Sequence, residues 1–231
     1  MPSFNFSKTL VIRFISYAAI IVGLFSLLFQ FGPLMMAEFN YRKDKLFDVK
    51  HVLPPVVITS AGTQDSSNAP TTSFSDIKSS DKLITPVSTD YGLVIEKINA
   101  NARVVADVDP ANEKEYVKAL SKGVAEAKGS TKPGQNGNLY IFSHSADAPW
   151  NIVRFNAIFY LLRELEKGDR IIVFYQGRRY DYIVFDKTIT KPSDVSFLSN
   201  RYDKPVLTLQ TCDPPGTLNN RLVIRAQLEG S

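Results

Sequence analysis

Hydrophobic and polar positions divide the chain into three regions, and the first is an almost unbroken apolar run over residues 14–36. This run is long enough to cross the roughly 30 Å hydrocarbon core of a bilayer as a helix. A cleaved signal peptide would have a shorter apolar region that ends in a small-residue cleavage site, and residues 37–41 contain no Ala-x-Ala pattern. We therefore expect an uncleaved transmembrane helix at 14–36, preceded by a short cytoplasmic N-terminus at 1–13.

The second region, residues 37–90, lacks sustained periodicity. After a juxtamembrane segment it becomes rich in Ser, Thr and Pro, and such sequences bury too little apolar surface to offset the entropy lost on ordering. We expect a spacer that holds the following domain above the bilayer. His51 lies in this region, and we interpret it as an ordinary exposed histidine without a functional role.

The third region, residues 91–231, has the pattern of one compact domain that is mainly β. Alternating or continuous apolar runs predict strands, and helical spacing predicts a short helix near 113–120 and an amphipathic helix at 151–167. Gln176-Gly177 is typical of a hairpin turn. Seven or eight strands with much antiparallel pairing favour a closed or nearly closed β-barrel. The predicted strands are 93–98, 103–108, 139–142, 170–175, 178–185, 206–211 and 221–225.

Composition narrows the possible functions. The net charge is +4, and no basic run is long enough to indicate nucleic-acid binding. The single cysteine excludes an internal disulfide. No grouping of His, Cys, Asp and Glu has metal-ligand spacing, and no glycine-rich phosphate loop occurs. We therefore predict that no cofactor is required.

The single cysteine, Cys212, ends the alternating run 206–211 on its polar face. Residues 213–216, Asp-Pro-Pro-Gly, cannot continue a strand. Alternation resumes at 221–225, with Arg221 on the polar face of that run. If the two runs pair as antiparallel strands, a thiol and a guanidinium meet on one polar surface. This arrangement indicates that the two side chains take part in a chemical reaction.

The sequence Thr-Leu-Gln-Thr-Cys at 208–212, followed by Arg221, resembles the active-site signature of the sortases. These are membrane-anchored cysteine transpeptidases of the bacterial cell surface, and their fold is an eight-stranded β-barrel. Their catalytic histidine follows an earlier apolar strand, where this chain has His144. One departure is Ser143, where the family usually has glycine. The resemblance runs from about residue 91 to 228, and within the family it is closest to class D/E-like or C-like members.

The resemblance implies a mechanism for these residues. Cys212 would attack a threonine carbonyl in a C-terminal sorting signal of Leu-Pro-x-Thr-Gly type on a secreted protein. His144 would protonate the leaving amine, and an amine of a peptidoglycan precursor or pilin subunit would resolve the thioester. Arg221 cannot act as a base, so its expected roles are to bind the oxyanion or a substrate carbonyl and to favour the thiolate. Thr211 would support the substrate, and Arg225 is a weaker candidate than Arg221.

Other implications of the resemblance concern location and cofactors. It places the domain outside the cell membrane, although basic residues on both sides of the apolar run leave the orientation open on charge alone. It also leaves calcium stimulation open, because some sortases use calcium. The connection 188–204 occupies the place where sortases recognise their signal.

Two alternatives remain at the level of sequence. One is another extracytoplasmic Cys/His hydrolase, such as an L,D-transpeptidase-like enzyme, although the Ser-x-Gly-Cys pattern of that class is absent around Cys212. The other is a catalytically silent, membrane-tethered binding module built on the same barrel. The presence of cysteine, histidine and arginine at all three signature positions argues against the silent module.

Overall fold

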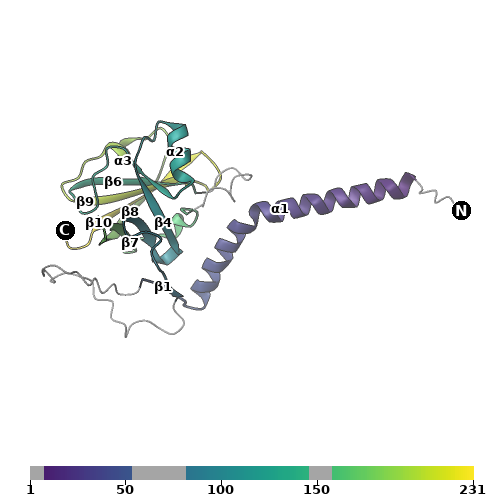
Figure 1. The fold of residues 1–231 in the computed structure, drawn as a ribbon, viewed down its shortest axis with the longest axis horizontal. Helices are drawn as coiled ribbons and strands as arrows, with labels where there is room; N and C mark the ends of the chain where they lie inside the picture. Colours follow the sequence, from purple (N-terminus) through teal and green to yellow (C-terminus); the bar gives the residue numbers. More distant parts are fainter. Residues whose placement is uncertain (1–7, 54–81, 146–157) are drawn as a thin grey trace.

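The computed structural model describes residues 8–53, 82–145 and 158–231. Eight strands close into a barrel in the order β10-β8-β7-β3-β4-β5-β6-β9, and a long N-terminal helix, α1, projects away from it (Figure 1). This confirms the predicted barrel. The strands are β3 (Tyr91–Ile95), β4 (Ala100–Val108), β5 (Val124–Ala127), β6 (Gly137–Phe142), β7 (Arg170–Tyr175), β8 (Arg178–Thr190), β9 (Pro205–Asp213) and β10 (Asn220–Leu228).

Alternation along β9 and β10 places apolar side chains inside the barrel and several polar ones on its outer face. On β9, Leu207 and Leu209 are completely buried in the barrel core. Because successive side chains point to opposite faces of a strand, Gln210 and Cys212 lie on the outer face. The same rule places Leu222 and Ile224 of β10 in the core. The inner and outer residues inferred from the periodicity of β9 and β10 are therefore confirmed.

Strand directions place several chain segments at one end of the barrel. β9 runs parallel to β6 and antiparallel to β10, and the chain of antiparallel pairs continues through β8 and β7 to β3. Strands β3, β6, β8 and β9 therefore share one direction, and their C-terminal ends lie at the same end of the barrel. We call this the Cys212 end, because Cys212 is the penultimate residue of β9.

The hairpin prediction is confirmed by the backbone. Gln176 and Gly177 join β7 to β8, and both have a left-handed backbone, with φ of 51° and 74°. Positive φ at both central residues is the condition for a type I′ turn, whose twist matches that of the flanking strands. The helix predicted near 113–120 is also present as α2 (Glu113–Leu120), capped by the Asn112 side chain.

The predicted helix at 151–167 is wrong over the part that the structure describes. Residues 151–157 lie outside the described residues, and the segment after them forms turns and a short 3₁₀ helix, η3 (Leu162–Glu164). Phe159, Leu162 and Leu165 are all completely buried in the barrel core. Apolar residues three positions apart can lie on one face of a helix. Here the same spacing occurs in an irregular segment, whose buried side chains cover the Cys212 end of the barrel.

The predicted membrane helix is part of α1 (Lys8–Leu46), which contains one stretch, Leu10–Phe29, that is long and apolar enough to cross a membrane. Its side chains do not pack on the barrel. The helix bends before it reaches the barrel (Figure 1). Pro33 lies within α1, and a proline nitrogen cannot donate the usual helical hydrogen bond.

Both ends of the predicted spacer lie against the barrel, while residues 54–81 are outside the described residues. Strand β1 (His51–Val52) pairs in parallel with β2 (Lys82–Leu83). Next to these strands, Leu53 and Ile84 are 2% and 5% exposed, in a cluster with side chains of β3 and β7. A few apolar residues at the two ends of a polar segment are therefore sufficient to fix those ends.

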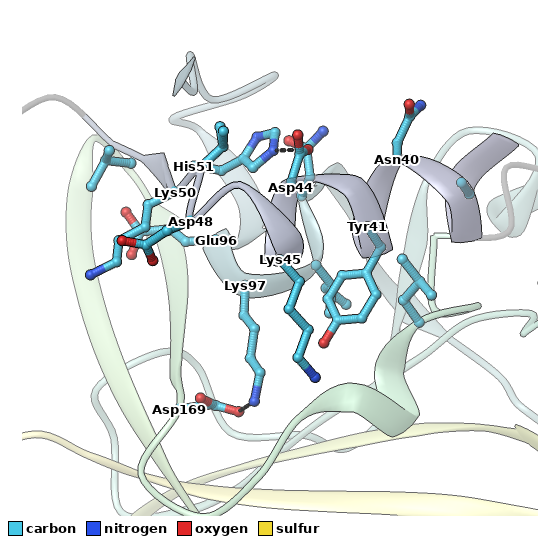
Figure 2. A pocket seen from close by; sticks show the side chains of 16 residues that line it. Asn40, Tyr41, Asp44, Lys45, Asp48, Lys50, His51, Glu96, Lys97 and Asp169 are labelled. Atoms are coloured by element: carbon cyan, nitrogen blue, oxygen red, sulfur yellow. Dashed lines mark hydrogen bonds and ion pairs between the residues drawn. The ribbon is translucent and has the colours of Figure 1, made fainter. Parts of the chain in front are cut away.

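The interpretation of His51 as an exposed histidine is wrong. Its side chain is 11% exposed, and its Nε2 lies 2.9 Å from Asp44 Oδ2 at the end of α1 (Figure 2). Lys82 Nζ donates to the same carboxylate over 3.1 Å. The cluster of Asp44, His51 and Lys82 thus joins α1 to β1 and β2. Periodicity could not reveal it, because the three residues come from three separate segments, α1, β1 and β2.

Candidate active site

Cys212 and Arg221 face each other across neighbouring strands. The ladder between β9 and β10 pairs Cys212 directly with Arg221, and both residues are half-buried on the outer face of the barrel. Residues opposite each other in an antiparallel pair have Cβ atoms about 4.5–5.5 Å apart. The strands therefore bring together the thiol and the guanidinium that the sequence placed on one polar surface.

His144 reaches the same place from the other neighbouring strand. The last parallel pair between β6 and β9 joins Phe142 to Gln210, and the backbone N–H of Ser143 donates to the Gln210 carbonyl over 3.1 Å. Two further residues along each chain bring His144 level with Cys212. All three predicted residues therefore lie at the Cys212 end of the barrel, with Cys212 between the other two.

Thr211 holds the backbone next to His144 in place. Its Oγ1 donates to the carbonyl oxygen of Ser143 over 2.9 Å, and Thr211 and Ser143 are 3% and 7% exposed. The alternation of β9 turns Thr211 toward the barrel interior, away from the outer face that carries Cys212. Its hydroxyl therefore positions the backbone of residue 143, and the expected support of the substrate by Thr211 stays a prediction.

The guanidinium of Arg221 forms hydrogen bonds to two backbone oxygens. Its Nη1 donates to the carbonyl oxygens of Asn220 and Leu218 over 3.1 and 3.4 Å. Within the part of the chain that the structure describes, no acidic side chain forms an ion pair with it, so its positive charge is available for an anionic group beside Cys212. Among the described residues, Arg221 therefore does not form the structural salt bridge that is the usual role of a surface arginine.

Arg225 has a different environment from Arg221. Its Nε donates to Asp186 Oδ2 over 3.0 Å and its Nη1 to the Tyr202 hydroxyl over 3.3 Å. The guanidinium also stands over the rings of Phe185 and Phe197, 5.2 and 5.5 Å from their centroids. Because Phe197 and Tyr202 belong to the connection between β8 and β9, Arg225 holds that connection against the barrel.

The connection between β8 and β9, residues 191–204 with the short helix α3 (Ser196–Ser199), forms one side of the site. Asp194 accepts hydrogen bonds from the hydroxyls of Ser196 and Thr190, over 2.6 and 2.7 Å, and these bonds lower its pKa. The backbone oxygen of Phe197 accepts a 2.8 Å hydrogen bond from Asn138. These hydrogen bonds therefore hold the connection in place beside the site.

Tyr140 and Gln210 form a polar pair next to the three predicted residues, and no local sequence pattern indicates it. The Tyr140 hydroxyl donates to Gln210 Oε1. Burial raises the pKa of Tyr140, while the nearby charge of Arg221 acts in the opposite direction. Gln210 stands two residues before Cys212 on the same face of β9. Only the register between β6 and β9 could have revealed the pair.

The opposite side of the site is linked to the segment that covers the barrel. Arg163 Nη2 lies 3.5 Å from Oδ1 of Asp213, the neighbour of Cys212. The next residue, Glu164, together with burial raises the pKa of Tyr41 on α1 to about 12. The end of α1 therefore lies against the segment that borders Cys212.

A cavity of about 550 Å³ lies between the end of α1 and the barrel, and none of the three predicted residues lines it (Figure 2). Its polar lining includes Asp44, Lys97 and Asp169, and Lys97 Nζ is 2.8 Å from Asp169 Oδ2. Within the described ranges, no group of three or more His, Cys, Asp or Glu side chains could hold a metal ion. The expectation that no cofactor is needed stays a prediction.

Comparison with known proteins agrees with this geometry. Residues 93–229 match the family model described as the sortase domain. The chain belongs to the sortase family. A curated relative, sortase D of Bacillus subtilis strain 168, is 28% identical over 128 residues. That match spans 55% of this chain and 56% of the relative.

Solved sortase structures share the barrel. A lid mutant of sortase A from Corynebacterium diphtheriae is 26% identical, with a TM-score of 0.51 over 62% of this chain and 72% of the other. Sortase C-1 from Actinomyces oris is 23% identical, with a TM-score of 0.52 over 63% of this chain and 77% of the other. The relatives thus include classes A, C and D, which leaves the subclass open.

Proposed function

We propose that this sortase is a cysteine transpeptidase that cuts a C-terminal sorting signal and transfers the new acyl end to an amine. The observation that carries the proposal is the position of Cys212, directly opposite Arg221 on β10 and level with His144 after β6. A nucleophile, a proton carrier and a fixed positive charge are the groups that acyl transfer requires.

The first half of the proposed reaction forms a thioester. The Sγ thiolate of Cys212 attacks the threonine carbonyl carbon of the signal, and the electron pair moves to the carbonyl oxygen beside the Arg221 guanidinium. When the tetrahedral intermediate collapses, the carbon–nitrogen bond breaks and protonated His144 gives its proton to the leaving amine. The threonyl group stays on Sγ, and His144 is left neutral.

The second half restores the enzyme. The nitrogen of the incoming amine attacks the thioester carbonyl, and neutral His144 takes the proton that this nitrogen loses. Arg221 again faces the oxyanion, and collapse of the intermediate releases the thiolate of Cys212. The product contains a new amide bond, and no oxidant, metal ion or nucleotide is consumed.

The partners follow from this chemistry and from family membership. The donor is a secreted protein with a Leu-Pro-x-Thr-Gly-like signal, and the acceptor is an amine of a peptidoglycan precursor or a pilin subunit. The Leu10–Phe29 stretch of α1 anchors the enzyme in the cell membrane, with the barrel on the extracytoplasmic side. The ordered connection between β8 and β9 contributes to the groove for the signal.

The test is a ligation assay with the full-length protein in detergent or nanodiscs. Quenched peptides with Leu-Pro-x-Thr-Gly or Leu-Ala-x-Thr-Gly would be offered together with a glycine-based amine, and the products analysed by mass spectrometry. We expect the ligated product from the natural protein and none from Cys212→Ala. Ligation by Cys212→Ala would contradict the mechanism. Binding of the peptide without cleavage would favour a silent binding module.

A further inference from the structure

The last part of α1, residues 35–46, together with the adjoining Phe47, follows the membrane-spanning stretch and contacts the barrel with one face. Ala37, Tyr41 and Asp44 line the cavity between α1 and the barrel. Positions three and four apart lie on the same side of a helix, so these three residues form one barrel-facing stripe. Tyr41 packs against the barrel core, and the Asp44 carboxylate forms hydrogen bonds with His51 and Lys82.

The opposite face of the same segment is apolar and exposed. Met35, Phe39 and Leu46, at spacings of four and seven, are 64%, 62% and 80% exposed. Met36 and Phe47 flank them and are 59% and 68% exposed. Single exposed apolar residues are common on soluble surfaces, but a contiguous group marks an interaction surface. We call Met35, Met36, Phe39, Leu46 and Phe47 the outer stripe.

We propose that the outer stripe lies on the phospholipid surface of the membrane that α1 enters, so that residues 35–47 form an interfacial helix between the bilayer and the barrel. This inference rests on the proposed membrane anchor. Continuity supports it, because Met35 follows Phe29, the end of the spanning stretch, by only six positions. The bilayer is therefore the apolar medium nearest to the stripe.

The chemistry of the stripe also fits a phospholipid surface. Arg42 and Lys43 lie on the same side of the helix, between Phe39 and Leu46, and both are exposed. Interfacial helices typically combine large apolar side chains with basic ones that reach the headgroups. The bend that α1 makes before it reaches the barrel would let residues 35–47 leave the direction of the spanning stretch and lie along the surface (Figure 1).

This arrangement would orient the barrel. The short helix η2 (Glu96–Ile98) follows β3 at the Cys212 end and lines the cavity beside α1, as does Asp169 before β7. The barrel therefore meets the interfacial helix through the Cys212 end. With lipid on the opposite face of that helix, the Cys212 end of the barrel faces the bilayer.

Site-directed spin labelling of the full chain in phosphatidylcholine–phosphatidylglycerol nanodiscs tests the inference. In a Cys212→Ala background, a single nitroxide would be placed by Phe39→Cys or Leu46→Cys on the outer stripe. Lys114→Cys on α2 of the barrel is the aqueous control. Val22→Cys reports on the membrane span itself. Power saturation would compare accessibility to oxygen, which concentrates in lipid, with accessibility to a water-soluble nickel chelate.

We expect labels at 39 and 46 to be several-fold more accessible to oxygen than to nickel, relative to the label at 114, and a still higher ratio at 22. Aqueous values at 39 and 46 with a lipid value at 22 would overturn the interfacial helix and leave the anchor standing. Aqueous values at all positions would overturn the anchor as well. Dipolar broadening at 39 that disappears on dilution with unlabelled protein would mean that a second copy covers the stripe, which also contradicts the inference.

Discussion

Arg221 lies directly opposite Cys212 in the ladder between β9 and β10, at the end of the barrel where β6 leads into His144. The three residues come from three adjacent strands and their extensions, with Cys212 in the middle. The ladder fixes Cys212 against Arg221, and the hydrogen bond from the Ser143 N–H to the Gln210 carbonyl holds the residue before His144 against β9. The position of a charged group opposite the thiol leads to the first prediction.

Arg221→Lys should reduce kcat/KM for the peptide by about 10²–10³-fold, the usual loss when an oxyanion donor is removed, with little change in Tm. Lysine keeps the charge but lacks the planar fork of arginine. Arg225→Lys is the matched control, because Arg225 lies on the same face but contacts Asp186, Tyr202 and two aromatic rings. It should lower Tm more than Arg221→Lys and affect KM more than kcat. If Arg225→Lys instead causes the larger fall in kcat, the two assignments are reversed.

Thr211→Val should destabilise the fold by about 1–3 kcal/mol, because the Ser143 carbonyl would lose the hydroxyl donor that satisfies it in the interior. Valine has nearly the same shape as threonine, so the packing change is small. The rate should also fall, since Ser143 precedes His144. Thr211→Ser keeps the donor and should restore most of both properties in urea unfolding and peptide assays. A larger loss in the serine variant than in the valine variant would show that the methyl group matters and the hydrogen bond does not.

The contact between α1 and the barrel should weaken in acid. Hydrogen bonds from His51 and Lys82 lower the pKa of Asp44 in the folded protein. The stabilisation that this carboxylate contributes is therefore complete above the ordinary aspartate pKa of about 4. It is lost as the pH falls through the lowered pKa.

Hydrogen exchange can measure this loss at the backbone N–H of Lys82 and Ile84, which donate to Lys50 and Val52. After correction for intrinsic rates, protection should hold from pH 6 to about pH 4 and fall as the pH is lowered further, while protection of the Ser143 N–H persists. Asp44→Asn should show the weakened state already at pH 6. Unchanged protection in that variant would mean that apolar contacts alone hold β1 and β2.

Much of the fold could be predicted because strand periodicity is a local property of the sequence. The runs that became β9 and β10 alternate clearly, and their inner and outer residues were assigned correctly. The segment 158–165 could not be interpreted in the same way. Its buried leucines fit helical spacing, but the structure uses them to cover the end of the barrel.

The candidate site was predictable to the extent that it depends on strand pairing and on the sortase signature. Cys212 and Arg221 follow from the two alternating runs, and His144 follows from the resemblance. The Tyr140–Gln210 pair depends on the register between two strands that are 70 residues apart, and the Asp44–His51–Lys82 cluster joins three segments. Such long-range registers leave no local pattern in one sequence.

The most direct test of the account is the intact mass of the full-length protein after brief mixing with a Leu-Pro-x-Thr-Gly peptide without an amine acceptor, followed by acid quenching and peptide mapping. We predict an added mass equal to the peptide up to its threonine, carried by Cys212 and released by hydroxylamine. His144→Ala should give far less of this adduct. An adduct on another residue, or cleavage of the peptide by Cys212→Ala, would contradict thioester catalysis at Cys212.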